Sequence, residues 1–143
     1  MGPSNYHKEY QKNEVSTSNQ GKLIIMMYDG AIKYANMAIQ ALDKKDMANK
    51  GLYIQKTHDI VNELSLALDL DKGGEVSRKL EDLYQFVLRQ LTLANMKGDR
   101  QALESILKIL NPLREAWEQI FNGPLNPELV PNTSPSKTIT NKC

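Results

Sequence analysis

Four stretches of this sequence carry apolar residues every three or four positions, which is the spacing of one face of an α-helix. The stretches cover about residues 19–44, 46–70, 75–97 and 99–121. A helix of about 24 residues is roughly 36 Å long, and short connections make successive helices antiparallel. The pattern therefore predicts an all-α fold, an antiparallel up-down four-helix bundle.

Residues that begin and end helices support these boundaries. Asp46 and Asp99 stand where N-cap residues belong, and Ser18 is the candidate N-cap of the first helix. The Gly73-Gly74 pair predicts a break between the second and third helices.

Helical phase predicts which side chains of the last three helices form the core. Pro112 lies inside the fourth pattern, where its ring clashes with the preceding turn and should kink the helix. The expected core residues are Tyr53, Ile54, Ile60, Val61, Leu64, Ala67 and Leu68, then Val76, Leu80, Leu83, Tyr84, Val87, Leu91 and Ala94, and then Leu103, Ile106, Leu107, Leu110, Leu113, Trp117, Ile120 and Phe121.

The two ends of the chain differ in composition from its centre. Residues 1–18 are polar, and the end of the chain is rich in Pro, Asn, Ser and Thr. Such segments cannot bury a core of their own. We therefore expect a flexible amino-terminal segment at 1–18, a bundle at 19–121 and a disordered Pro-rich tail at 122–143.

The composition gives no support to several function classes. The only cysteine is Cys143 and the only histidines are His7 and His58, so no disulfide, thiolate cage or clustered metal site is expected. The net charge of +1 gives no bias toward nucleic acid. The longest apolar run, residues 23–28, is too short to span a bilayer, and no secretory signal opens the chain. We expect a cytoplasmic protein without cofactor, metal, nucleic acid or membrane insertion.

Two helical-bundle classes with chemistry of their own also lack the residues that they need. An enzyme of chorismate mutase type needs convergent basic residues inside the bundle. Arg78 and Arg89 fall on the polar side of the third helix, and Arg114 alone intrudes on an apolar arc. A haem or metal bundle needs facing ligands, and His58 has no mate. The sequence therefore predicts a protein that is not an enzyme.

The first helix has more apolar surface than two neighbouring helices can cover. Its polar residues fit within about 60° of the circumference, whereas a bundle helix needs an apolar arc of only about 100–150°. Two interpretations remain open: the helix is central and covered by the chain ends, or the surplus surface binds an amphipathic partner segment. The apolar residues of this helix are Leu23, Ile24, Ile25, Met26, Met27, Tyr28, Ala31, Ile32, Tyr34, Ala35, Met37, Ala38 and Ile39, and the off-core ones of the next two helices are Leu52, Leu66, Leu70, Phe86 and Leu93.

Particular motifs resemble a known family. Residues 10–32 read YQKNEVSTSNQGKLIIMMYDGAI. This run resembles the opening of the flagellin-specific export chaperone family, FliS, which has a tyrosine, a Val-x-Thr-x-Ser segment and a helix with a Tyr-Asp-Gly-Ala-Ile box. The resemblance continues, in register, at residues 58–64 (HDIVNEL), 71–75 (DKGGE), 94–95 (AN) with Asp99, and 114–117 (REAW). It covers about residues 6–121.

The resemblance implies a cytoplasmic bacterial chaperone that holds the disordered carboxy-terminal segment of flagellin. The segment folds into helices on the chaperone, which prevents premature filament polymerisation and presents flagellin to the flagellar type III export apparatus. An export-gate component and a co-chaperone or regulator are further candidate partners, and the free protein is expected to be a monomer or weak dimer. The alternative is a generic helical adaptor or oligomerisation module without flagellin as its client.

The expected client-binding residues come from the surplus surface and from the amino-terminal segment. Tyr6 and Tyr10 are expected to pack over the client groove in the free protein, or else to close the bundle as a fixed staple. Tyr28 is expected to bury its ring with a partner for its hydroxyl, and mid-helix Gly30 suggests a close helix crossing. The full set of client-binding residues is Tyr6, Tyr10, Ile24, Ile25, Tyr28, Ile32, Leu66, Leu70, Phe86 and Leu93.

Overall fold

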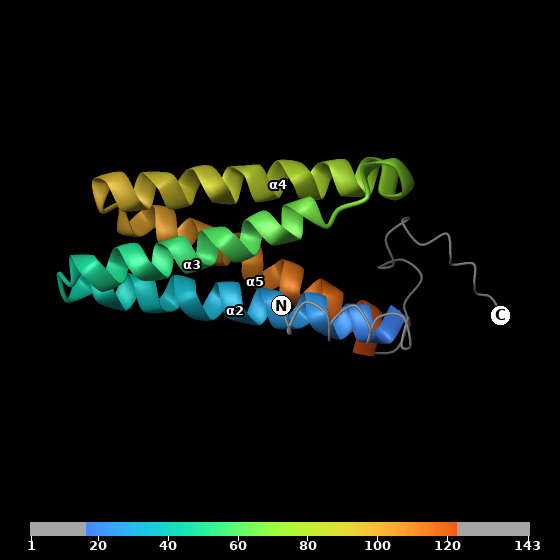
Figure 1. Cartoon of the computed structure of the whole chain (residues 1–143), viewed down its shortest axis with the longest axis horizontal. Helices are drawn as coiled ribbons and strands as arrows, with labels where there is room; N and C mark the ends of the chain where they lie inside the picture. The colour runs from blue at the N-terminus through green and yellow to red at the C-terminus, as the bar shows by residue number, and fades with distance from the viewer. Residues whose placement is uncertain (1–16, 123–143) are drawn as a thin grey trace, which may run out of the picture.

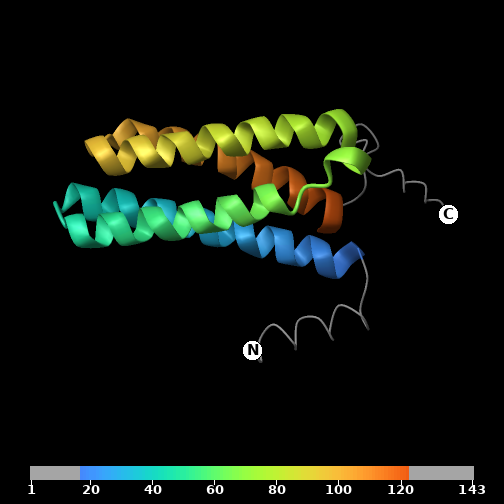
Figure 2. The ribbon, with the colours of Figure 1, turned by 45° about the horizontal axis from the view of Figure 1, so that its top comes forward.

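Four helices in a ring form the bundle of this computed structural model, which describes residues 17–122. They are α2 (Thr17–Asp43), α3 (Met47–Leu66), α4 (Leu70–Lys97) and α5 (Arg100–Asn122). Each runs antiparallel to the next (Figure 1). Helix α2 contacts α3 and α5, and α4 contacts the same two helices from the far side, so α2 and α4 lie on one diagonal (Figure 2). The predicted up-down four-helix bundle is confirmed.

Aspartates begin three of the four helices. Asp46 caps α3 by accepting a hydrogen bond from the Asn49 amide, and Asp99 accepts from the amides of Gln101 and Ala102 at the start of α5. Both predicted N-caps are thus confirmed. The prediction for Ser18 is wrong, because α2 already begins at Thr17 and Ser18 lies inside it.

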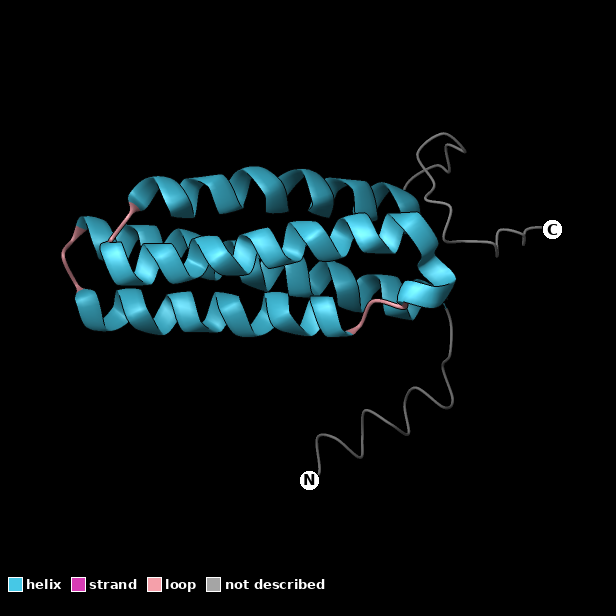
Figure 3. Cartoon of the chain, turned by 90° about the horizontal axis from the view of Figure 1, so that it is seen from above, coloured by secondary structure: helices cyan, strands magenta, loops and turns pink. Residues whose placement is uncertain are grey.

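The break predicted at the glycine pair is a kink within α4 rather than a loop before it. Asp69 caps α4 by accepting from the Lys72 amide, so residues 70–73 form a first helical turn that the sequence patterns did not predict. Gly74 then leaves the helical conformation, with φ 58° and ψ −135°, which a residue with a side chain adopts only with strain. The connections between helices are short in every case, as Figure 3 shows.

Side chains from all four helices form one core, and most of the predicted core residues belong to it. The prediction for Leu83 is wrong: it is 36% exposed, although helical phase predicts it in the core. Ala67 is exposed too, because α3 ends at Leu66. Helix α5 continues through Pro112, which is exposed.

Small residues let α2 approach its neighbours closely. Ala31, Ala35 and Ala38 are fully buried on its inner face. A Cβ at Gly30 would lie 3.2 Å from Ile60 Cδ1 of α3, which confirms the predicted close crossing. Gly21 lies against the ring of Phe121, which leaves no room for a side chain and joins the first turns of α2 to the end of α5.

Two tyrosines meet in the centre of the bundle. Tyr28 of α2 and Tyr84 of α4 are buried, and their hydroxyl oxygens lie 2.5 Å apart across the diagonal. Each hydroxyl thus finds its hydrogen-bond partner inside the core, as buried tyrosines usually do. Burial raises the pKa of both hydroxyls above the ordinary tyrosine value, so both remain protonated at neutral pH.

Candidate functional site

A second apolar stripe runs along α2 on the flank that faces α3. Its positions are 23, 27, 30, 34 and 37, a spacing of alternately four and three residues that keeps them on one side of a helix. Tyr34 and Gly30 show which side this is, because Tyr34 stacks on Tyr53 of α3 and Gly30 lies against Ile60. The stripe is therefore distinct from the inner face of α2.

Solvent reaches most of this stripe. Met26, beside it, is 64% exposed and Leu23 is exposed too, while Met27, Tyr34 and Met37 are half-buried. Unbranched methionine side chains adapt their shape to a partner, so such a surface can accept apolar side chains of varied form. We call the following residues the α2/α3 seam: Leu23, Met26, Met27, Gly30, Tyr34 and Met37 of α2, with Tyr53, Lys56 and Ile60 of α3.

The predicted client-binding residues of α2 lie off the seam, and all of them pack against the core or within it. Ile24 and Ile32 are half-buried and pack against the core. Ile25 and Tyr28 are buried, so their side chains offer no surface in this structure, and they support the helix from within. Their buried positions bring no surface to a partner without a rearrangement of the bundle.

The remaining predicted residues lie elsewhere, and the structure does not bring all of them to one face. Leu66, at the end of α3, is 73% exposed, and Leu70, at the start of α4, is exposed as well. Phe86 and Leu93 are half-buried on the flank of α4 opposite to Glu81, which bonds to α3. Since α4 is diagonal to α2, one rigid helix on the seam cannot contact this flank.

Two predicted residues, Tyr6 and Tyr10, lie outside the described residues. Conversely, the set of predicted site residues contains no residue of the seam. Leu23, Met26, Met27, Tyr34 and Met37 were counted only as surplus apolar surface. Their alternating spacing is the signal that separates them from the residues of the inner face.

The opposite flank of α2 is held to α5 by ion pairs. Arg114 donates from Nε to Asp29 Oδ1 at 2.7 Å and pairs with Glu118 at 2.9 Å. The hydrogen bond to Asp29 raises the pKa of the Arg114 guanidinium above its usual value. Arg114, the one arginine on an apolar arc, is therefore neutralised within the bundle and does not form a basic catalytic cluster.

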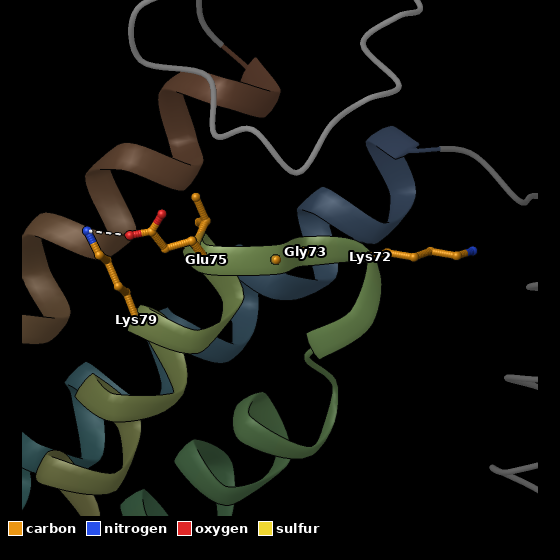
Figure 4. A pocket seen from close by; sticks show the side chains of 6 residues that line it. Lys72, Gly73, Glu75 and Lys79 are labelled. Atoms are coloured by element: carbon orange, nitrogen blue, oxygen red, sulfur yellow. Dashed lines mark ion pairs between the residues drawn. The ribbon is translucent and has the colours of Figure 1, made fainter.

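Two hollows lie away from the seam. One, of about 350 Å³, lies at the kink of α4, where Figure 4 shows Lys79 beside Glu75 while Lys72 extends away from both. The two lysines therefore do not converge on one ligand. The other, of about 170 Å³, lies between α3 and α4 and includes His58 and Met96. Neither hollow gathers the convergent charges or ligands of an enzyme site.

Neither a metal-binding cluster nor a membrane-spanning helix is found among the described residues. Within residues 17–122, no three side chains of His, Cys, Asp or Glu lie close enough together to hold a metal ion. None of the four helices is both long enough and apolar enough to cross a bilayer.

Fold and surface together define a class: a small all-α bundle with an apolar seam on its outside. Comparison with known proteins identifies the family within that class. A family model of the flagellar protein FliS matches residues 2–124. The chain therefore belongs to the FliS family of flagellar secretion chaperones, and its role is that of a flagellar export chaperone.

Individual relatives match this chain along most of their length. The chain is 36% identical over 110 residues to the flagellar secretion chaperone FliS of Salmonella typhimurium, covering 76% of this chain and 82% of the relative. It is 32% identical over 123 residues to that of Bacillus subtilis, covering 86% and 91%. With FliSB of Pseudomonas aeruginosa it shares 29% identity over 117 residues, covering 79% and 93%.

Proposed function

We propose that this protein is a cytoplasmic chaperone that binds the disordered carboxy-terminal segment of flagellin, prevents premature filament polymerisation and delivers flagellin to the flagellar type III export apparatus. The single observation that carries the proposal is the α2/α3 seam, an apolar stripe on the outside of a helix whose inner face already has its own core contacts. Family membership supports the chaperone role.

The seam fits an amphipathic helix. Positions 23 to 37 span about 21 Å along α2, at 1.5 Å per residue, which equals about four turns of a bound helix. A helix that lies in the seam presents its own side chains at similar spacing, as in other helix-in-groove complexes. A client that is disordered when free and helical when bound can supply such a segment, at the cost of its ordering entropy.

The proposed contacts beyond the seam require the client to wrap around the bundle. Leu66 and Leu70 lie where α3 connects to α4, and Phe86 and Leu93 lie farther round on α4. An extended client that leaves the seam and continues past this connection reaches both sets in turn. The entropy cost of ordering a long client is offset only by a large interface, and two separate contact regions provide one.

Tyr6 and Tyr10 enter the proposal through their place in the sequence. Their segment precedes the first turn of α2, and Leu23 and Met26 lie within the first ten residues of that helix. We propose that the segment covers this end of the seam in the free protein and moves when the client binds. Export-gate components and a co-chaperone or regulator remain further candidate partners, and none of these roles requires a catalytic step, metal or cofactor.

The experiment is calorimetric titration with the carboxy-terminal segment of the flagellin encoded in the same genome. We expect saturable one-to-one binding, a negative heat-capacity change and a gain of helical circular dichroism. The variants Met26→Glu and Leu66→Glu should each weaken binding at least about tenfold, because a charge at an apolar contact must be desolvated. Met96→Glu is the matched control, since Met96 is as exposed as Leu66 (73% each) but lies outside the proposed contact regions.

Two results would contradict the proposal. Equal affinities of all three variants would remove the seam and the α3–α4 connection from the interface. A folded protein that fails to bind the segment, and instead self-associates in sedimentation experiments, would favour the adaptor or oligomerisation module.

A further inference from the structure

Two lysines from different helices converge on one aromatic ring of the seam. The rings of Tyr34 and Tyr53 are stacked, with centroids 6.0 Å apart and an angle of 15° between their planes. Lys33 Nζ lies 5.7 Å and Lys56 Nζ lies 5.6 Å from the centroid of the Tyr34 ring. Two positive charges therefore flank the same aromatic surface, one from α2 and one from α3.

Neither ammonium group has a carboxylate partner among residues 17–122. The acidic residue one turn before Lys33 is Asp29, which is held by Arg114 on the other flank of α2. The acidic residue one turn after Lys56 is Asp59, which accepts a hydrogen bond from Gln55 at 2.9 Å. Both lysines are exposed, so a partner can reach them without unfolding the bundle. Their mutual repulsion is relieved when an anion binds between them.

We propose that the segment bound on the α2/α3 seam is an acidic amphipathic helix, which places a carboxylate between Lys33 and Lys56. Its apolar side chains pack on Leu23, Met27 and Met37 and on the Tyr34 ring. The inference rests on the proposed function of the seam and adds the chemistry of its partner. A pair of ammonium groups beside an apolar stripe selects a helix that carries both apolar side chains and a carboxylate.

The geometry also gives the register of the acidic residue. Tyr34 lies toward the end of the seam that is nearer the turn between α2 and α3, whereas Leu23 lies at the other end. The bound helix therefore has its carboxylate near one end and its apolar residues over the three turns beside it. A basic residue at that position is disfavoured by both lysines, so charge fixes the direction of the client as well as its affinity.

The test is a charge-reversal series in the full-length chain, titrated with the carboxy-terminal segment of flagellin. The variants are Lys33→Glu/Lys56→Glu and Lys33→Gln/Lys56→Gln, and the control Lys97→Glu/Lys108→Glu makes the same charge change at exposed lysines of α4 and α5. At low salt we expect the reversed variant to bind at least about 20-fold more weakly and the neutral variant about fivefold more weakly, with the control within about twofold. The differences should shrink at about 0.5 M salt, where charges are screened.

A second arm identifies the carboxylate. Each Asp and Glu of the flagellin segment is changed to its amide, and one of these changes should lose its effect in the Lys33→Gln/Lys56→Gln background, as coupled groups do in a double-mutant cycle.

The outcomes separate the two proposals. If wild-type protein binds the segment but the reversed variant matches the control, the acidic-helix inference is overturned and the proposed function stands. The same holds if no acidic residue of the segment couples to the lysines. If wild-type protein does not bind, the proposed function fails, and the inference about its partner fails with it. Circular dichroism spectra of the four proteins establish that each variant is folded.

Discussion

Removing one of the two central hydroxyls gives a sharp test of how the core is held together. Tyr28 and Tyr84 are 0% and 2% exposed, and their oxygens lie 2.5 Å apart. Tyr28→Phe deletes one oxygen with little change of shape, so that the Tyr84 hydroxyl stays buried without this partner. A stranded buried hydroxyl costs about 1–3 kcal/mol, so we expect the free energy of unfolding to fall by about that amount.

The two single variants should differ. Burial raises the pKa of the Tyr28 hydroxyl, and the nearby side chains of Tyr84 and Trp117 offset part of this increase. In Tyr84→Phe, the Tyr28 hydroxyl therefore keeps the Trp117 indole as a neighbour, and we expect a smaller loss than in Tyr28→Phe. The double variant removes both hydroxyls and strands neither, so its loss should be smaller than the sum of the single losses by about 1 kcal/mol or more.

The assay is urea unfolding followed by far-ultraviolet circular dichroism, with all four proteins of the cycle measured under one set of conditions. Tyr53→Phe is the control, because Tyr53 is half-buried and its change should stay within about 0.5 kcal/mol. Single losses that add within about 0.3 kcal/mol in the double variant would refute the reasoning, since uncoupled sites add to that precision.

Three further predictions concern pH, the kink and the core. Burial raises the pKa of Tyr28 and Tyr84 above the usual 10.0, so the unfolded chain releases these protons at lower pH than the folded protein does, and the stabilisation that is complete below about pH 10 should be lost as the pH rises further. Urea unfolding as a function of pH should show a smaller loss of stability for the Tyr28→Phe/Tyr84→Phe variant than for the wild type. Equal losses would contradict this linkage. Gly74→Ala should destabilise the protein by about 1–3 kcal/mol, because φ is +58° at this position, although no atom lies within 4 Å of the added Cβ. Thermal unfolding without a decrease in stability would show that this backbone conformation accepts a side chain without strain. Val87→Ala should lower the free energy of unfolding by about 1–3 kcal/mol, whereas Leu83→Ala, at a site 36% exposed, should lose less than about 1 kcal/mol, and the reverse order in urea unfolding would place Leu83 in the core after all.

Helical spacing was enough to predict the fold because four long patterns with short breaks leave few alternatives. The N-caps at Asp46 and Asp99 followed from residue type and position alone. Asp69 was missed because the glycine pair four residues later looked like the end of a helix. In fact Gly74 kinks the helix after its first turn, and glycine in a sequence pattern does not distinguish a kink from a loop.

The candidate site was less predictable, because a wheel of one helix does not show which neighbour covers each flank. Ile25 and Tyr28 lie in an apolar run with Leu23 and Met26, yet the first pair is buried and the second exposed. Leu83 shows the same limit in α4, since helical phase predicts it in the core but it is 36% exposed. Only the packing of whole helices decides such border positions.

Buried polar residues were missed for a similar reason. Lys50, 7% exposed, donates from Nζ to the carbonyl of Asn95 at 3.0 Å, so its charge lies among the last carbonyls of α4. Thr57 is fully buried, and its hydroxyl donates to the Tyr53 carbonyl of its own helix. Hydropathy places both outside, since it does not include the partner that makes burial tolerable.

The alanine-lined inner face of α2 has a consequence for the uniqueness of the bundle. A row of methyl groups is smooth, so Ala31, Ala35 and Ala38 alone would permit α2 to slide along its axis by one turn with little loss of packing. Such a slide moves a side chain by about 5.4 Å, enough to separate the hydroxyls of Tyr28 and Tyr84 beyond hydrogen-bond distance. The tyrosine pair, together with the close contacts of Gly21 and Gly30, therefore helps to fix the axial position of α2, and with it the position of the seam on its outer flank.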